Sequence, residues 1–449
     1  MLKKSLIENM KTRLGLDISS ILLPVKEVDM QRWAVVACDQ YTSEPEYWND
    51  VENFVGESPS TLRLIFPEVY LENETEEEKT SRINRINDSM TTYLDSNLLY
   101  EYKNSMILVE RTFKSGVKRH GLMLAIDLEN YDYSEGSQSL IRATEGTIID
   151  RLPPRIRIRE SAPLEIPHIM VLIDDAEKTV IEPLIENTGS LNQLYSFELM
   201  KQSGSLKGWQ INEEHLIENV VNALLKLADK ENFQSRYNVN NDYEVLLFAV
   251  GDGNHSLATA KACWENIKKS KNESELKDHP ARYALVELVN VHDNGLAFEP
   301  IHRVVFDANP GHLFDSFISY YKNQGCNVKI IHGSEKPATS GHAIKFVTEE
   351  GYGYIVVECP LYNLDVGTLQ SFLDDYLKNN NQVGIDYVHG NDVTEKLGKQ
   401  PGNIGFFLSN MDKKELFRTV ILEGALPRKT FSMGEAAEKR FYLEARKIK

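Results

Sequence analysis

The sequence predicts a mixed α/β protein of the α+β type, because helix-like and strand-like segments alternate along the chain in no fixed order. Amphipathic spacing predicts a helix over residues 213–230, and alternation of apolar and polar residues predicts a hairpin over residues 106–128. No segment repeats at a constant period, which excludes a solenoid of stacked repeats. The length of 449 residues predicts two or three domains. We place one boundary between residues 1–306 and residues 307–449, where the predicted elements become shorter.

The elements of the first part follow from local patterns. A Glu-rich first turn predicts that residues 75–97 begin as a helix, since acidic side chains suit the positive end of a helix dipole. The predicted hairpin joins two alternating segments, residues 106–114 and 118–128, at Ser115 and Gly116. Further expected elements are an extended segment over 25–37, an apolar strand over 169–173, a buried strand over 243–250, a helix over 257–269 and strands over 283–291 and 300–306.

The second part reads as short alternating units. Its expected elements are helices over 312–322, 369–378 and 413–422, strands over 328–332, 384–389 and 404–408, and a hairpin over 343–359.

The charge and the cysteines limit the class of protein. With 50 Lys+Arg against 67 Asp+Glu the net charge is −17, which argues against binding to nucleic acid or to an anionic membrane. The four cysteines form no CxxC pair, so neither a disulfide framework nor a zinc site is expected. No apolar segment is long enough to cross a bilayer, and the start of the chain lacks a signal region. We therefore expect a cytoplasmic protein whose partner is a small anionic molecule, with its oligomeric state left open.

The loop Gly251-Asp252-Gly253-Asn254-His255-Ser256 separates a predicted strand from a predicted helix. Two glycines allow a sharp turn, and the helix start offers free N–H groups and its positive dipole end, so the loop suits phosphate or carboxylate. Asp252 is a candidate helix cap or cation ligand. A tight turn with no ligand is the alternative. The dinucleotide fingerprint fails for want of its third glycine, and the nucleophile elbow fails because Ser256 lacks glycines two residues away on either side.

A second cluster is rich in arginine and lies between residues 142 and 159, at Arg142, Arg151, Arg155, Arg157 and Arg159. Alternation at Arg155, Arg157 and Arg159 predicts one face of an extended segment, suited to bidentate binding of phosphate. The alternative is an edge strand in surface ion pairs. Single basic residues elsewhere, such as those at 302–303, 389 and 428–429, are each more typical of structural roles.

The order of these motifs resembles the family with domain of unknown function 1015. The matching blocks are Val36-Ala-Cys-Asp-Gln-Tyr41, Glu145-Gly-Thr-x-x-Asp-Arg-Leu152, Val250 to Ala260, Leu288 to Val304, and Leu426-Pro-Arg-Lys-Thr-Phe431. The central block is also similar to the Asp-Gly-His-His-Arg motif shared by ParB-type proteins, sulfiredoxin and free-serine kinases. Here Asn254 replaces the first His of that motif and Ser256 replaces the Arg.

The resemblance implies a ParB/sulfiredoxin-like ligand-binding core within residues 1–306, extended at its N-terminus, with residues 307–449 as an α/β portion packed against it. In that group the loop and the helix start hold nucleotide phosphates, so Gly251, Asp252, Gly253, Asn254, His255 and Ser256 are the expected cofactor-binding residues. Because the arginine is missing, we expect cations from elsewhere to complete the site, and the candidates are Arg151, Arg155, His302, Arg303, Arg428 and Lys429.

The leading functional prediction is a phosphoryl-transfer enzyme that acts on serine or phosphoserine with ATP or ADP and Mg²⁺. Asp39 or Glu145 is the candidate base, His255 a catalytic partner, and Asp252 the candidate metal ligand. The alternative is a non-catalytic sensor or scaffold that binds an anionic metabolite or nucleotide. In both cases we expect His255 and at least one of the six candidate cations to line one cleft, with Asp39 or Glu145 on its opposite wall.

Overall fold

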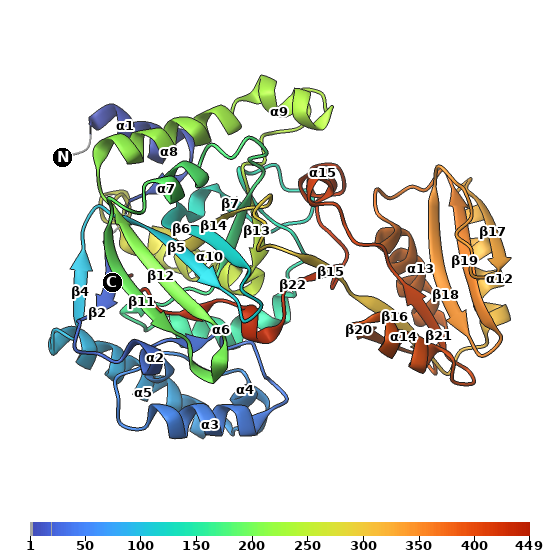
Figure 1. The fold of residues 1–449 in the computed structure, drawn as a ribbon, viewed down its shortest axis with the longest axis horizontal. Helices are drawn as coiled ribbons and strands as arrows, with labels where there is room; N and C mark the ends of the chain where they lie inside the picture. Colours follow the sequence, from blue (N-terminus) through green and yellow to red (C-terminus); the bar gives the residue numbers. More distant parts are fainter. Residues whose placement is uncertain (1–2, 19) are drawn as a thin grey trace. The chain divides into compact units, whose positions relative to one another are not determined.

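The computed structural model describes residues 3–18 and 20–449, and it confirms the mixed α/β class. The chain forms two compact units (Figure 1): Met1–Leu296 together with Gly434–Lys449, and Ala297–Met433. This division differs from the predicted boundary at 306/307 in two ways. The strand predicted at 300–306 belongs to the second unit, and the C-terminal residues return to the first. No local composition marks either crossing, because both depend on contacts made far along the chain.

Helices of the first unit surround one large sheet, with α7 and α8 above it and α2, α3 and α5 below it in the view of Figure 1. Their bounds are α1 (Lys4–Glu8), α2 (Met30–Trp33), α3 (Pro45–Val55), α4 (Val69–Asn73), α5 (Glu76–Asp95), α6 (Leu152–Arg159), α7 (Glu182–Glu186), α8 (Glu214–Leu227), α9 (Lys230–Tyr237), α10 (Asn254–Lys268) and α11 (Glu273–Leu276).

Among the described residues, ten strands form the large sheet, and parallel and antiparallel pairs are mixed in it. The order is β11 (Asn192–Glu198), β12 (Ser205–Ile211), β5 (Met106–Thr112), β6 (Lys118–Asp127), β14 (Tyr283–Asn290), β10 (Met170–Ile173), β13 (Phe248–Asp252), β8 (Ile141–Ala143) and β7 (Tyr131–Asp132), with β1 (Leu16–Asp17) on β6. Strand β10 is parallel to β14 and antiparallel to β13. The end of β13 therefore lies beside the start of β10, and residues flanking both strands meet there.

Two local predictions are confirmed closely. Strands β5 and β6 form the expected hairpin, with Thr112 opposite Lys118 and Gly116 at φ 85° in the turn. Helix α5 starts after Thr75, whose hydroxyl accepts the Glu78 N–H while the Glu78 carboxylate accepts the Thr75 N–H. This capping box satisfies two backbone donors at once, which explains why the helix begins at this point.

The arginine cluster is not extended, contrary to the prediction. Residues Leu152–Arg159 form helix α6, which Pro153 and Pro154 can open because the first helical positions need no intrahelical N–H bond. The three arginines of this helix reach different acidic partners: Arg155 pairs with Glu68, Arg157 with Glu76 and Arg159 with Glu165. The alternation of arginine with apolar residues led to the wrong prediction of an extended segment, since the two prolines fix the start of a helix.

The backbone conformation at the junction between β13 and α10 requires a glycine at position 253. Helix α10 begins at Asn254, three residues before the predicted start, so Asn254, His255 and Ser256 lie in its first turn. Gly253 has a φ of 78°, and a Cβ atom there would lie 3.0 Å from the Ile169 Cα atom. A side chain at 253 would therefore strain the backbone and push against the segment before β10.

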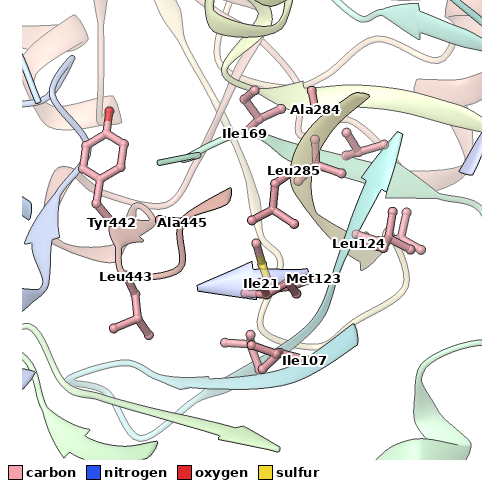
Figure 2. Packing of buried hydrophobic residues seen from close by; sticks show 14 of the residues in the cluster. Ile21, Ile107, Met123, Leu124, Ile169, Ala284, Leu285, Tyr442, Leu443 and Ala445 are labelled. Carbon is pink, nitrogen blue, oxygen red and sulfur yellow. The ribbon is translucent and has the colours of Figure 1, made fainter. Parts of the chain in front are cut away.

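The C-terminal segment is built into the first unit (Figure 2). Tyr442, Leu443 and Ala445 lie among core side chains such as Ile21 and Ile169. Short strand β23 (Phe441–Tyr442) pairs with β3 (Val35–Val36), and β24 (Arg446–Lys447) pairs with β9 (Leu164–Glu165). Another short pair joins β2 (Ile21–Pro24) to β4 (Leu99–Tyr102). The segment is thus fixed on both sides of Tyr442.

Buried ion pairs hold the same segment. The Arg440 guanidinium, 5% exposed, contacts the carboxylates of Glu287 and Glu444, and Arg446 pairs with Glu165 at 2.6 Å. Both guanidinium groups are desolvated, and removal of one partner would leave a charge buried without its counterion. These pairs fix the backbone directly after Lys439 and on either side of Tyr442.

In the second unit, an antiparallel sheet carries a core of its own. Its strand order is β17 (Asn327–His332), β19 (Gly351–Glu358), β18 (His342–Thr348), β21 (Ile404–Phe407), β16 (His302–Phe306) and β20 (Gly384–Val388). A separate pair joins β15 (Phe298–Pro300) to β22 (Phe431–Met433), and the helices are α12 (Pro310–Lys322), α13 (Asp365–Asn379), α14 (Asn391–Gly398) and α15 (Lys413–Glu423). Across both units, no helix in the described part of the chain has the length and apolar character that a bilayer span requires.

Candidate functional site

Four segments of the first unit meet at the start of α10. They contribute Cys38 and Asp39 after β3, His168 before β10, the residues 252–256 after β13, and Lys439 with Tyr442 from the C-terminal segment. The antiparallel pairing of β10 with β13 places the first residues of one strand beside the last residues of the other. Residues up to 404 positions apart in the sequence come into direct contact here, as between Cys38 and Tyr442.

His168 occupies the centre of this cluster. Its side chain is 7% exposed, its Nδ1 atom lies 2.7 Å from the Tyr442 hydroxyl, and its Nε2 atom lies 3.3 Å from the Ser256 hydroxyl. The Tyr442 hydroxyl donates to Cys38 Sγ at 3.0 Å. Since that phenol has one proton, His168 donates its Nδ1–H to the phenol oxygen. The Nε2 atom on the other side of the ring faces the Ser256 hydroxyl.

Asp39 is the carboxylate that faces the Nε2 atom of His168. Its Oδ2 atom lies 3.8 Å from His168 Nε2, and its Oδ1 atom accepts a hydrogen bond of 2.9 Å from the Gln40 side chain. Burial disfavours the charged form, but the charge of His168, the Gln40 hydrogen bond and the charge of Lys439 together lower the pKa of the Asp39 carboxyl group below its usual value. Asp39 is therefore a carboxylate at neutral pH.

Asp252 forms an ion pair with Lys439. The Lys439 Nζ atom lies 3.0 Å from Asp252 Oδ2, and the Gly253 N–H donates to Asp252 Oδ1 at 3.0 Å. Both carboxylate oxygens thus have partners from the chain. Within the described residues, no group of three or more His, Cys, Asp or Glu side chains is arranged to hold a metal ion. A Mg²⁺ ion usually keeps water and phosphate oxygens as most of its ligands and takes only one or two carboxylates from the protein.

His255 lies on the other side of the helix start. Its Nε2 atom accepts a hydrogen bond of 3.3 Å from the Ile148 N–H. Burial and the positive charges of Arg155 and Arg151 lower the pKa of His255 to about 4, against the opposing charge of Asp39. At neutral pH the imidazole is uncharged, so it offers hydrogen bonds to a ligand and no charge of its own.

The first turn of α10 has backbone donors free for a ligand. In the described structure, no side chain caps this 15-residue helix at Gly253. Asn254 donates its side-chain N–H to the Val250 carbonyl at 3.3 Å, and its Oδ1 atom is buried with no hydrogen-bond partner among the described residues. The buried Thr147 Oγ1 atom, in the loop that contacts His255, also has no partner in that part of the chain. Unsatisfied polar atoms beside an open helix N-terminus are typical of a ligand site.

The other predicted residues of the first unit are distributed as follows. Glu145 is half-buried in the loop between β8 and the short 3-10 helix η4 (Ile149–Arg151), and Arg151 is exposed at the end of η4. Arg155 pairs with Glu68, whose N–H donates to the Cys38 carbonyl at 2.8 Å. The structure therefore gathers Asp39, the 252–256 turn, Arg151 and Arg155 near His255, as their electrostatic effect on its pKa also indicates.

The remaining four predicted cations lie in the second unit. Arg303 is fully buried and donates to the backbone oxygens of Ile301, Arg428 and Lys429. His302 Nδ1 accepts the Leu408 N–H at 3.1 Å. Arg428 and Lys429 are exposed and lie over the ring of Tyr387, at 5.6 and 4.8 Å from its centroid. A cleft shared by these residues and His255 stays a prediction.

Sequence reasoning missed His168, Lys439 and Tyr442. His168 had one local signal, since it directly precedes the apolar strand at 169–173 much as Asp252 follows the strand at 243–250. Lys439 and Tyr442 lie in a short irregular segment with no motif. Only the pairing of β23 with β3 brings them to the site.

The chain belongs to the family described as protein of unknown function (DUF1015), whose model matches residues 22–376. Similar solved structures include a free serine kinase in complex with AMP, at 9% identity and a TM-score of 0.37, covering 73% of this chain and 92% of that one. A conserved hypothetical protein from Pyrococcus furiosus is similar at 9% identity and a TM-score of 0.34, covering 72% of this chain and 90% of that one. SbnI with a C-terminal truncation, from Staphylococcus aureus, is similar at 9% identity and a TM-score of 0.34, covering 70% of this chain and 83% of that one. No curated protein matches the sequence significantly.

Proposed function

We propose that this protein transfers a phosphoryl group between a nucleotide and the hydroxyl group of a small hydroxy compound of the serine or phosphoserine type. One observation carries the proposal: the Asp39 carboxylate and the His168 ring lie beside the open first turn of α10. Phosphoryl transfer needs mainly an anion site, charge neutralisation and a group that accepts the hydroxyl proton. These three requirements are met within one cluster of the first unit.

In this proposal the first turn of α10 binds the phosphates. The N–H groups of residues 254–256 donate to phosphate oxygens, and Lys439 supplies the positive charge that the motif loses when Ser256 replaces its arginine. The neutral His255 adds a hydrogen bond. The buried Asn254 Oδ1 atom accepts a hydroxyl or ammonium donor from the bound molecules.

Asp39 acts as the general base and accepts the proton of the attacking hydroxyl group. Its lowered pKa keeps it ionised, and His168 holds it in place from a ring that is itself fixed by Tyr442. Glu145, the other candidate from the sequence, is a half-buried residue in the loop between β8 and η4 and is the alternative base. A Mg²⁺ ion bound with the nucleotide would neutralise phosphate charge, with Asp252 as its candidate carboxylate ligand.

The second candidate is a sensor or scaffold that binds a nucleotide or anionic metabolite without turnover. The ion pair between Asp252 and Lys439 favours it, because Lys439 already neutralises the candidate metal-side carboxylate. The two candidates share the anion site at α10 and differ in whether Asp39 receives a proton.

The test is phosphorus NMR on the full chain with Mg²⁺, using ATP with serine in one direction and ADP with phosphoserine in the other. We expect formation of ADP and a phosphomonoester, or the reverse, and loss of turnover in Asp39→Asn with nucleotide binding retained. Nucleotide-dependent stabilisation of about 2–4 kcal/mol at saturation without turnover of any substrate supports the sensor. Neither turnover nor stabilisation contradicts both candidates.

A further inference from the structure

A cavity of about 150 Å³ adjoins the cluster around His168 in the first unit. Four of its lining residues belong to the cluster: Cys38, His168, Ser256 and Tyr442. Most of the other lining side chains are apolar and come from α5, α6 and the segments at 64–71 and 162–169, among them Leu64, Phe66, Met90, Ile158, Ala162 and Ile166. The proposed phosphoryl transfer leaves this apolar space without a role.

The charged groups in the lining have partners within the protein. Arg155 pairs with Glu68, and Arg159 pairs with Glu165, which also binds Arg446. These pairs neutralise the carboxylates and guanidinium groups at the cavity wall. A charged ligand group placed here would lose its hydration and gain no counterion, which costs several kcal/mol. The occupant is therefore an uncharged group.

The size and polarity of the cavity further limit the class of chemical group that it can hold. An engineered apolar cavity of about 150 Å³ holds one benzene molecule, so the space here suits a branched alkyl group or a single ring. A purine base has several ring nitrogens and an exocyclic group, and most of them would be buried against hydrocarbon without hydrogen bonds. Free serine has no group that would fill the space.

We propose that this cavity receives an uncharged hydrocarbon group, up to the size of a benzene ring, carried by the hydroxy compound that the enzyme phosphorylates. The inference rests on the proposed function and deepens it, because it assigns the substrate class. The position of the cavity indicates that the hydrocarbon group belongs to the hydroxy compound and not to the nucleotide. His168 lines the cavity and lies 3.8 Å from the proposed base, so a hydroxyl near Asp39 places its neighbouring carbon atoms at the cavity.

The first test compares hydroxy amino acids of increasing hydrocarbon content as acceptors with ATP: serine, threonine, β-hydroxyleucine and β-phenylserine. Each buried methylene contributes about fourfold in affinity, so kcat/KM for the two larger acceptors should exceed that for serine by at least about tenfold. Equal or lower kcat/KM for the larger acceptors, with serine turned over, overturns the cavity proposal and leaves the proposed function intact.

Two variants change the volume of the cavity in opposite directions. Ala162→Leu fills it and should abolish the preference for β-phenylserine while serine turnover persists. Met90→Ala enlarges it and should shift the preference toward the largest acceptor. Met10→Ala is the matched control, since Met10 is a buried methionine of the same core, 2% exposed against 5% for Met90, and does not line the cavity. A shift of preference in the control as large as in Met90→Ala overturns the proposal.

A binding experiment without nucleotide separates this inference from the proposed reaction. We expect 2-phenylethanol to perturb methyl resonances of the cavity lining in the wild type and in Met10→Ala, and to leave those of Ala162→Leu unchanged. Binding of 2-phenylethanol with no phosphoryl transfer to any acceptor supports the ligand class of the cavity and contradicts the proposed function. Absence of 2-phenylethanol binding together with turnover of serine overturns the cavity proposal alone.

Discussion

The sequence predicts an anion site at the turn 252–256 of the first unit and offers Arg303 of the second unit as a candidate cation for it, but the polar atoms of the two regions are used differently. Arg303 is fully buried, and its guanidinium group donates to three backbone oxygens and to the Gln370 side chain. At the start of α10, in contrast, backbone donors are uncapped and the buried Asn254 Oδ1 atom has no partner among the described residues. A basic residue is available to a ligand only when the protein has not already satisfied its hydrogen bonds.

The comparison shows polar atoms without partners among the described residues at the start of α10 and hydrogen bonds that use the guanidinium group at Arg303. It also explains why the number of basic residues in the sequence motifs is a poor guide to which of them lie at the site. Lys439 was in no sequence motif, yet it lies 3.0 Å from Asp252. Four predicted cations make contacts within the second unit instead.

The largest effect is expected for Asp39→Asn. The variant keeps the shape of the side chain and removes the carboxylate that accepts the hydroxyl proton, so kcat should fall by about 10²–10⁴-fold. Stopped-time assays of phosphoryl transfer measure this change. Asp374→Asn is the matched control in the second unit, where Asp374 pairs with Arg428 at 3.4 Å. A fall in kcat for Asp374→Asn as large as for Asp39→Asn would contradict the division of roles between the two regions.

Arg303→Met tests the structural side of the comparison. It leaves three backbone oxygens, that of Ile301 buried and those of Arg428 and Lys429 part-buried, without their donor, so the free energy of unfolding of the second unit should fall by about 3 kcal/mol. Arg428→Met, which removes an exposed ion pair, should cost less than about 1 kcal/mol. Urea denaturation followed by tyrosine fluorescence and hydrogen exchange of second-unit amides measures both. A stable Arg303→Met variant with weakened nucleotide binding would instead assign Arg303 to a ligand site.

Patterns of a few neighbouring residues predicted the turns and helix starts, because these are determined by contacts within a few residues. Ser115 and Gly116 mark the β5–β6 turn, and the Glu-rich start after Thr75 marks α5, because turn and cap chemistry act over a few residues. The same holds for Gly253, which only glycine's backbone freedom explains. The candidate site was predicted as far as the 251–256 loop and Asp39. His168 and Tyr442 were missed because their contact joins residues 274 positions apart, and no local pattern reports such a pairing.

Lys439→Met tests the same comparison by removing the ammonium group that lies beside the turn at 252–256. We expect the dissociation constant for ADP to rise about tenfold, since one charge-assisted hydrogen bond to phosphate is lost. Lys429→Met is the matched variant in the second unit, and it tests the predicted shared cleft directly. Calorimetric titration of both variants gives the answer: an effect of Lys429→Met equal to that of Lys439→Met would favour the shared cleft.

The smallest effect is a pH dependence that arises at His255. In the folded protein its pKa is about 4, because of burial and the charges of Arg155 and Arg151, whereas in the unfolded chain it is about 6.5. Above pH 6.5 the group is neutral in both states and has no effect. As pH falls from 6.5 to 4 the unfolded chain takes up a proton that the folded chain does not, so the folded state loses stability across this window. Because the side chain is only partly buried, solvent screening keeps the loss small.

The variant His255→Gln removes the titrating imidazole and so isolates its contribution to the pH dependence of stability. Its thermal midpoint should fall less than that of the wild type between pH 6.5 and 4, and the two curves should run parallel above pH 6.5. His312→Gln in the second unit is the control. An imidazole NMR titration adds a second readout: the His255 midpoint should lie near 4 in the free protein and rise when ADP binds, because phosphate charge favours the imidazolium form. A free-protein midpoint near 6.5 would mean that His255 is neither buried nor close to the two arginines, and the site at the start of α10 would lose one of its walls.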